Sequence, residues 1–480
     1  MEVSGRRVRD RLLFWVPVAF FAAVVSYQLL GPVPIGMSDN GDFSRVTAPL
    51  GLWPTAAPPG SPDSRTQFHF FLPAYTIHQE SWDSGVPSTE IWIAWAAKGI
   101  SRVLLPKDHF DLRVMGVLHA LIMLMALICL LRSLRERNPW IRLSAAALVL
   151  WMWTDVMYVQ QFSTAYTDAG AVVALCLIFS VTLIVLLAPG GRRVWWAPVY
   201  ALAGLFLLGT KLQHAPALVP LAAFCILMAF RRGVSRPARM VWSVTPFLLA
   251  GTAFFMARET PEQYRTAPAF SVVFFKIAVL ARDPGRALAD FRMPQEEYGK
   301  YIGHYYYEHT IPYDKPGFNE KIRSLVTPGS LASFYAHNPR TLWRVVRADW
   351  LVSASDVNLG NYGILRETDV RDSKASPEFN LWSGFRRRLF MGAPPYPLVF
   401  FAAAFLLGAG GVFSRKWRAG FPLWPVPAMM TLVALSGFLT SSLMDAAETA
   451  RHMVLFQAGT DLTILSLFLA LVVRNAPTRA

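Results

Sequence analysis

The stretch that decides the fold is residues 168–188, which read DAGAVVALCLIFSVTLIVLLA. One Asp opens it and no other charged residue follows. A helix of about 20 mainly apolar residues is what crosses the hydrocarbon core of a bilayer. Nine further segments share this character, so the sequence predicts an all-α polytopic membrane protein with about ten transmembrane helices. The ten predicted segments are 12–31, 111–131, 142–162, 168–188, 195–213, 214–230, 241–257, 396–413, 421–443 and 453–473.

The composition of the whole chain supports this class. Of its 480 residues, 54% are hydrophobic and 16% are charged, whereas soluble chains have about 25% charged residues. The net charge of +15 would suggest nucleic acid in a soluble protein, but the long apolar runs argue against that partner. Three cysteines, Cys129, Cys176 and Cys225, lie inside apolar runs and predict neither a metal site nor a disulfide framework.

The first segment has a basic start like that of a secretory signal peptide. Its apolar stretch is long, however, and Gln28-Leu29-Leu30-Gly31-Pro32 offers no small-x-small cleavage site. We therefore expect an uncleaved signal anchor. Segment 214–230 is short and contains two prolines, so it could begin as a broken or re-entrant helix.

The positions of Lys and Arg predict the orientation, because short cytoplasmic loops are enriched in basic residues. With a cytoplasmic N-terminus, 19 basic residues fall in the six short segments on the cytoplasmic side. The short turns on the other side, 163–167 and 444–452, contain only Arg451. We predict a multi-pass protein of the plasma or inner membrane, with both termini in the cytoplasm and its active site on the extracytoplasmic side.

Three regions follow from this topology. Residues 1–257 form an N-terminal transmembrane module with a first outer loop over 32–110, and residues 396–480 form the C-terminal helices. Between them, residues 258–395 form an extracytoplasmic region that either binds an acceptor or braces the fold. Apolar residues recur at helical spacing over 89–104 in the first loop, which predicts an amphipathic helix in the membrane interface.

Four polar clusters flank the predicted helices, all on the extracytoplasmic side. Ionisable groups near membrane depth are costly, so each cluster is a candidate functional site. The clusters are Asp39, Asp42 and Arg45; Tyr166 and Asp168; Lys211, Gln213 and His214; and Glu448, Arg451 and His452.

Each cluster also has a purely structural explanation. Asp39 or Asp168 could cap a helix, Lys211 could reach the interface as an anchor, and His452 could be ordinary interfacial polarity. Two further acids, Asp155 and Asp461, lie within predicted spans. They either line the same cavity as the clusters or only hydrogen-bond Thr154 and Thr460.

Taken together, the clusters indicate one chemistry. A carboxylate at the outer surface is suited to act as general base on an acceptor hydroxyl, and nearby Lys, Arg and His are suited to hold a phosphate. An enzyme facing outward has no access to nucleotide sugars made in the cytosol. A polyprenyl-phosphate-linked sugar, delivered through the bilayer, removes that difficulty.

These residues make the chain resemble the GT-C superfamily of polytopic glycosyltransferases, and within it the hexose transferases typified by WsfD. The superfamily has an acid just past its first span, often in an acidic pair followed by an aromatic residue. Asp39 and Phe43 match, whereas Asn40 departs from the acidic pair. The other similar motifs are Ser163, Tyr166 and Asp168; Lys211, Gln213 and Pro216; Gly360, Asn361 and Tyr362; and Arg451, His452 and Asp461. Asp168 departs from the group's pattern, which has a Glu at this position.

The resemblance implies transfer of a sugar, most simply a hexose, from a polyprenyl-phosphate donor to an extracytoplasmic glycan or lipid acceptor. Asp39 is the implied general base, and Asp42 is the second catalytic candidate. The residues implied in substrate binding are Arg45, Tyr166, Asp168, Lys211, Gln213, His214, Asn361, Arg451 and His452. No metal site is predicted, although a role for a divalent cation stays open.

Three other classes compete with a transferase. A lipid-linked glycan flippase or transporter would distribute charges through the depth of the spans and show paired broken helices, which the sequence does not. A ligase or polymerase of preassembled glycan would share the outer face and the lipid donor. A non-catalytic assembly factor is the third.

Overall fold

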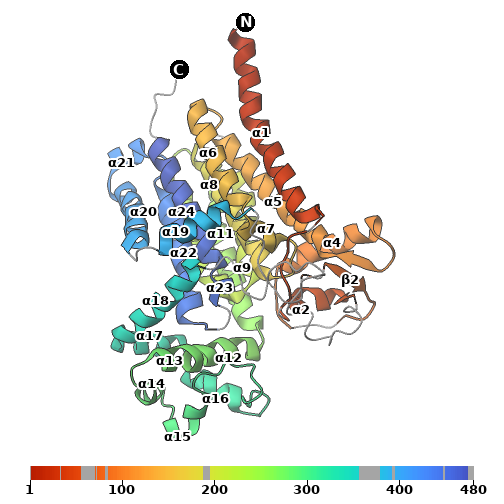
Figure 1. Cartoon of the computed structure of the whole chain (residues 1–480). Helices are drawn as coiled ribbons and strands as arrows, with labels where there is room; N and C mark the ends of the chain where they lie inside the picture. Colours follow the sequence, from red (N-terminus) through yellow and green to blue (C-terminus); the bar gives the residue numbers. More distant parts are fainter. Residues whose placement is uncertain are drawn as a thin grey trace.

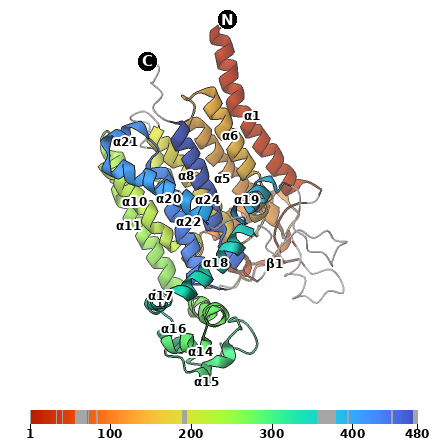
Figure 2. The ribbon, with the colours of Figure 1, turned by 60° about the vertical axis from the view of Figure 1, so that its left-hand side comes forward.

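The computed structural model shows a bundle of long helices with two smaller modules at one end (Figure 1). It describes residues 2–32, 34–39, 41–55, 71, 73–81, 85–187, 195–355, 379–391, 395–446 and 449–473. The start of α1 and the end of α24 lie at the opposite end of the bundle from the two modules, as Figure 2 also shows. The end that carries the modules is called the loop end below.

The bundle helices coincide with the ten predicted segments. Seven of the described helices are long and apolar enough to cross a membrane, or eight if one bent pair counts as a span. Two shorter apolar helices, over 196–210 and 399–413, account for the remaining two segments. The bundle comprises α1 (Glu2–Leu30), α5 (Leu112–Ser133), α6 (Pro139–Trp153), α7 (Val156–Phe162), α8 (Thr167–Leu187), α9 (Trp196–Thr210), η3 (Leu212–Ala217), α10 (Leu218–Phe230), α11 (Arg236–Glu259), α20 (Pro395–Phe413), α22 (Pro425–Leu443) and α24 (Val454–Val472).

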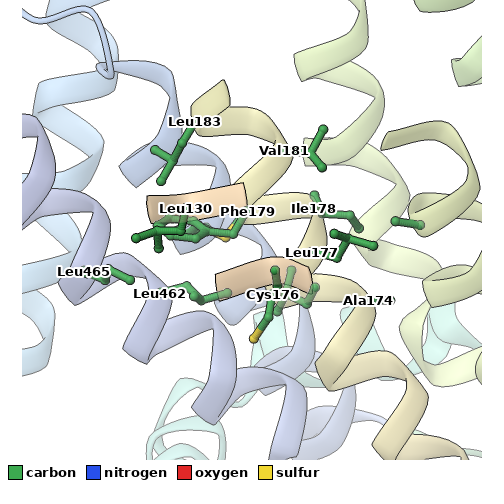
Figure 3. Close-up of a cluster of buried hydrophobic side chains, with 14 of the residues drawn as sticks. Leu130, Ala174, Cys176, Leu177, Ile178, Phe179, Val181, Leu183, Leu462 and Leu465 are labelled. Carbon is green, nitrogen blue, oxygen red and sulfur yellow. The ribbon is translucent and has the colours of Figure 1, made fainter. Parts of the chain in front are cut away.

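Helix α8 is the centre of the bundle. Within its most apolar stretch, 94% of the residues are buried inside the protein, because α5, α9 and α24 all pack against it. Figure 3 shows Cys176 and Phe179 of α8 beside Leu130 of α5 and Leu462 of α24. The three cysteines are buried and free, as predicted.

Two of the spans depart from a regular α-helix. Helices α6 and α7 meet at an angle of 58°, where the Asp155 side chain accepts a hydrogen bond from the Met157 amide and caps α7. Segment 214–230 begins as the 3-10 helix η3, which contains Pro216, before α10 starts. Residues 212–230 nevertheless form one continuous span with an irregular first turn, whereas the described residues have their sharp break at Asp155, where none was predicted.

The first loop folds into a small module that includes strands. Strands β1 (Leu52–Pro54), β2 (Ala74–Ile77) and β3 (His109–Asp111) form an antiparallel sheet in the order β1-β2-β3, with Tyr75 opposite Phe110. The sequence analysis did not foresee this sheet. The module also contains α2 (Ser44–Thr47), η1 (Ala48–Leu50) and the predicted amphipathic helix, α4 (Glu90–Leu104), on which Trp92 and Trp95 are exposed.

The start of α4 is fastened to the loop end of α9. The Ser88 hydroxyl donates to the Thr210 carbonyl (2.8 Å), and the Thr89 hydroxyl and amide donate to the carbonyls of Phe206 (2.7 Å) and Gly209 (2.8 Å). These bonds satisfy carbonyls that a helix end leaves without partners. They hold the C-terminus of α9 at the point where Lys211 follows.

The predicted region 258–395 contains two separate parts. Residues 262–355 form a helical module, here called the loop domain, with its own aromatic-rich core that includes Phe270, Phe274 and Tyr306. Its elements are α12 (Glu262–Ser271), the π-helix η4 (Val272–Ile277), α13 (Ala278–Leu280), α14 (Pro284–Asp290), α15 (Gln295–Tyr298), η5 (Gly299–Tyr301), α16 (Phe318–Leu325), α17 (Pro328–His337) and α18 (Pro339–Ser355). The second part, α19 (Leu381–Met391), packs back onto the bundle at α6.

The packing of α22 against α24 yields the first testable prediction. A Cβ atom added at Gly459 would lie 2.9 Å from the backbone Cα of Ala434, whereas one added at Gly251 would meet nothing within 4 Å. Small residues let membrane helices approach closely, and overpacking costs about 1–3 kcal/mol. We expect Gly459→Ala to lower the thermal unfolding midpoint in detergent and Gly251→Ala to leave it unchanged. Equal midpoints for the two variants would contradict this packing.

Candidate functional site

The segment after α1 places two acids at the loop end in different surroundings. The Oδ1 atom of Asp39 accepts hydrogen bonds from the amides of Gly41 (2.7 Å) and Phe43 (3.0 Å). Gly41 has φ of +99°, a conformation that glycine adopts without strain. Among the described residues, Oδ2 of Asp39 receives no hydrogen bond, so one oxygen stays available for another donor.

Burial raises the pKa of Asp39 to about 6, and the neighbouring Asp42 adds to the rise. The two amide hydrogen bonds and Arg451 act in the opposite direction but do not cancel it. A carboxylate with a pKa near neutrality is suited to take up a proton from a hydroxyl and to release it again.

Asp42 is held between two arginines. One carboxylate oxygen lies 2.6 Å from Arg45, and the other lies 2.5 Å from Arg451. Burial alone would raise the pKa of Asp42, but the charges of Arg451, Arg45 and Lys211 outweigh it and hold that pKa well below its usual range. Asp42 is therefore a fixed anion that positions arginines, and it is poorly suited to accept a proton.

Arg451 joins two of the predicted clusters. Besides its bond to Asp42, its guanidinium carbon lies 4.5 Å from the ring centroid of Tyr166. Tyr166 packs edge-on against Phe43, with centroids 4.6 Å apart, and its hydroxyl donates to the Ser38 carbonyl (2.8 Å). A buried arginine is stable only when it is paired, and this one is paired with the segment that carries Asp39.

The third cluster lies against the start of α8. Asp168 is buried, with Lys211 Nζ at 3.9 Å and His214 Nε2 at 3.7 Å from its Oδ1 atom. The His214 Nδ1 atom lies 2.8 Å from the hydroxyl of Thr210. The Lys211 ammonium therefore stands near a carboxylate but beyond hydrogen-bond distance from it.

A chain of hydrogen bonds connects the third cluster to the fourth. Gln213 donates to the Ser441 hydroxyl (2.6 Å), which donates to the carbonyl of His452 (2.7 Å). The Nδ1 atom of His452 lies 2.6 Å from Asp445, and its Nε2 atom lies 3.2 Å from an Arg451 nitrogen. These contacts place the His452 ring between Asp445 and Arg451.

The four sequence clusters thus meet in one place, called the loop-end cluster below. Its members are Asp39, Asp42, Arg45, Tyr166, Asp168, Lys211, Gln213, His214, Arg451 and His452. Of the predicted site residues, Asn361 lies outside the described residues, as do its neighbours Gly360 and Tyr362 and the acid Glu448. Among the described residues, no group of three His, Cys, Asp or Glu side chains is placed to hold a metal ion.

Sequence reasoning missed Lys276 and its partners, which border the loop-end cluster. The Lys276 ammonium donates to Asp349 (2.9 Å) and to the carbonyls of Ser442 (3.0 Å) and Asp445 (2.6 Å). All three bonds are buried, and they fasten the loop domain to the segment that ends α22. The signal was present, because Lys276 is a single charge within the apolar run VVFFKIAVL over 272–280.

Asp155 and Asp461, the two acids within the predicted spans, have neither of the two roles that the sequence suggested. Asp155 accepts hydrogen bonds from the amides of Trp382 and Ser383 (both 2.9 Å), and Asp461 accepts from the Trp382 indole and the Tyr158 hydroxyl (both 2.9 Å). The hydroxyls of Thr154 and Thr460 bond their own helices instead. The two acids anchor the start of α19, and neither contacts the loop-end cluster.

The Lys276 contacts predict a large effect on stability. Removing one partner of a buried ion pair typically costs about 3–5 kcal/mol, because the other charge stays buried without compensation. We expect Lys276→Met to lower the thermal unfolding midpoint strongly and the double variant Lys276→Met/Asp349→Leu to regain part of the loss.

Lys321→Met is the matched control, because Lys321 pairs with Glu297 on the surface with both side chains more than half exposed. Exposed pairs contribute little, so its midpoint should stay near that of the wild type. Similar midpoints for Lys276→Met and Lys321→Met would show that the buried pair does not fasten the loop domain.

Comparison with known proteins identifies a family for the chain, whereas the solved structures that it resembles share only 10–12% sequence identity with it. No curated protein matches it. Three solved structures of oligosaccharyltransferases from Archaeoglobus fulgidus, the first of them named AglB, are similar in outline. They are the complex with an inhibitory peptide and a dolichol-phosphate (10% identity, TM-score 0.38, 95% of this chain and 50% of that chain), the form tethered to an acceptor peptide (11%, 0.38, 96% and 49%) and the apo form (12%, 0.39, 96% and 50%).

The chain spans about half the length of those structures. The family comparison is more specific, since the model of the YfdI N-terminal transmembrane domain matches residues 6–479. This family, rather than the WsfD-typified group suggested by the sequence motifs, is the one identified. The chain belongs to the YfdI N-terminal transmembrane domain family.

Proposed function

We propose that the chain is a GT-C-like membrane glycosyltransferase that transfers a hexose from a polyprenyl-phosphate donor to an extracytoplasmic glycan or lipid acceptor. The observation that carries the proposal is that Asp39 keeps an available carboxylate oxygen within electrostatic reach of Arg451, while Arg451 and Lys211 both act on the neighbouring Asp42 at the loop end of the bundle. The GT-C-like motifs in the sequence support the same reading.

Asp39 is the proposed general base. Its Oδ1 atom is held by two amides, and Oδ2 would receive the proton of the acceptor hydroxyl. The hydroxyl oxygen attacks the anomeric carbon of the donor, and the bond from that carbon to the phosphate oxygen breaks. The polyprenyl phosphate leaves with the bonding electrons. Direct attack of this kind inverts the configuration of the anomeric carbon.

Lys211 is the proposed phosphate ligand. Its side chain is 16% exposed and its nearest carboxylate oxygen lies at 3.9 Å, so among the described residues its N–H groups have no hydrogen-bond acceptor within range. A largely buried ammonium with open donors favours an anion. Charge that develops on the leaving phosphate would be stabilised by Lys211 and, behind it, by Arg451.

Tyr166, Asp168, Gln213, His214 and His452 would position these groups. The contacts of Asp168 with Lys211 and His214 set the direction of the ammonium. The bonds from Gln213 through Ser441 to His452 link the two halves of the phosphate site. We place no reaction step on a divalent cation.

Replacement of the proposed base tests the function directly. We expect Asp39→Asn to lower transfer of hexose from a polyprenyl-phosphate hexose by about 10²–10⁴-fold in proteoliposomes, the usual contribution of a general base. Asp108→Asn is the matched control, because Asp108 is an exposed acid of the first loop with φ of 64°, which Asn also tolerates. Transfer by Asp39→Asn near the wild-type rate would contradict the base assignment.

In cells, the same proposal predicts which glycan is lost. A deletion strain should lack a single hexose on its surface glycan when the glycan is analysed by mass spectrometry. Accumulation of complete, untransferred glycan would instead indicate a ligase or flippase.

The pH dependence of transfer is a separate prediction. Asp39 accepts a proton only when ionised, and burial raises its pKa to about 6. The value of kcat/KM should therefore rise as pH increases and level off above about 6, whereas an ordinary carboxylate would titrate near pH 4. A profile that is flat from about pH 5 to about pH 8 would contradict the role of this group.

A further inference from the structure

The loop domain contributes aromatic side chains to the edge of the loop-end cluster. Tyr264 of α12 lies against Arg45, whose guanidinium carbon is 4.5 Å from the ring centroid. Arg45 in turn lies 2.6 Å from Asp42. A ring from the loop domain, an arginine and an acid from the first loop therefore form one continuous set of contacts three residues along the chain from Asp39.

Tyr307 is the second ring at this edge. Burial raises the pKa of its hydroxyl, and Arg45, Tyr264, Asp42 and Tyr306 are near enough to act on it electrostatically. The ring is nevertheless 44% exposed. Among the described residues, the hydroxyls of Tyr264 and Tyr307 have no hydrogen-bond partner.

The Tyr307 ring is supported from behind. It packs edge-on against Tyr306, with centroids 5.0 Å apart, and lies 6.2 Å from the ring of Tyr313. Tyr306 is buried, and its hydroxyl donates to Asn319 (2.8 Å). One side of the Tyr307 ring is thus fixed on the core of the loop domain, and the exposed part is free to meet a ligand.

The Lys276 contacts fix the position of the loop domain, and with it Tyr264 and Tyr307, relative to the membrane bundle. They join the loop domain to the carbonyls of Ser442 and Asp445, and Asp445 contacts His452 of the cluster. The two tyrosines are therefore held on the cluster by buried bonds as well as by their own contacts.

The chemistry of this edge selects among ligands. The Arg45 guanidinium already pairs with Asp42 at 2.6 Å and lies over the Tyr264 ring, so a phosphate at this edge would compete with the Asp42 carboxylate. Tyrosine hydroxyls and an ion pair are poor partners for an alkyl chain, whose burial requires an apolar surface. A neutral pyranose matches both features, because its C–H face packs on an aromatic ring and its hydroxyls bond to charged and phenolic groups.

We propose that Tyr264 and Tyr307, with Arg45 and Asp42, form a subsite that binds a neutral hexopyranose of the acceptor glycan next to Asp39. This inference rests on the proposed transferase function and makes it more specific, since it selects a glycan acceptor over a lipid one. The loop domain is then the part of the chain that recognises the acceptor.

Steady-state kinetics with varied acceptor test the subsite. We expect Tyr307→Ala to raise the KM for the acceptor by about three- to tenfold, the range that loss of an aromatic contact predicts, while the KM for the polyprenyl-phosphate donor stays within about twofold. Tyr307→Phe keeps the stacking ring and should show a smaller change. Tyr305→Ala is the matched control, because Tyr305 is 39% exposed in the same loop and its backbone amide bond to Glu308 (2.9 Å) is kept in the variant. An acceptor KM that is unchanged in Tyr307→Ala, or raised equally in Tyr305→Ala, would overturn the proposal.

A binding measurement separates the subsite from the transferase function. Saturation-transfer NMR with protein in nanodiscs would use the methyl glycosides of glucose, galactose, mannose and rhamnose, with sorbitol as the acyclic control. We expect at least one glycoside to bind the wild type, with its signal reduced in Tyr264→Ala/Tyr307→Ala and retained in Asp39→Asn.

Retained glycoside binding in a protein that transfers no sugar would support the subsite and reject the transferase. Transfer activity together with glycoside signals that are equal in the wild type and the double tyrosine variant would support the transferase and reject the subsite.

Discussion

The ion pair between Arg451 and Asp42 is the contact on which the loop end depends. It joins residues 409 positions apart, with 2.5 Å between nitrogen and oxygen, and the arginine is 3% exposed. A guanidinium so deeply buried requires a partner that also orients it. Asp42 meets that requirement, and in doing so it fixes the turn that carries Asp39. The Tyr166 ring beneath the guanidinium ties the same pair to the start of α8. The central helix, the first loop and the C-terminal helices therefore share one electrostatic junction.

Buried charges elsewhere in the chain follow the same rule. Lys276 pairs with Asp349 inside the loop domain and donates to the carbonyls of Ser442 and Asp445 at the end of α22. Asp155 and Asp461 hold the start of α19 against the bundle. Each set of contacts connects an element outside the long helices to one of them. Buried charges require partners, so each set specifies where its element docks. Asp39 and Lys211 are the polar residues of the cluster to which we assign the proposed chemistry.

Much of this arrangement was predictable from sequence, for physical reasons that differ by region. Long apolar stretches such as 168–188 identify membrane helices because the bilayer fixes their length, and α4 was predicted from the helical spacing of its apolar residues.

The four polar clusters were identifiable because polar groups near a membrane stand out against apolar neighbours. The contacts among them were not, since Asp42 and Arg451 are distant in sequence and nothing local pairs them. The distinction between Asp39 as an available base and Asp42 as a fixed counterion depends on those contacts. The small sheet was also missed, because β1, β2 and β3 span only three or four residues each. The aspartates 155 and 461 were misjudged because their partners lie on α19, far along the chain.

The central claim is that the loop-end cluster binds the phosphate of a polyprenyl-phosphate sugar beside Asp39. An electron cryo-microscopy structure of the protein in nanodiscs with added polyprenyl phosphate tests it most directly. The account predicts phosphate density within hydrogen-bond distance of Lys211, next to Arg451, with the Asp39 carboxylate facing the position of the anomeric carbon. Phosphate density at another place in the bundle, with Lys211 and Asp39 unchanged, would contradict it.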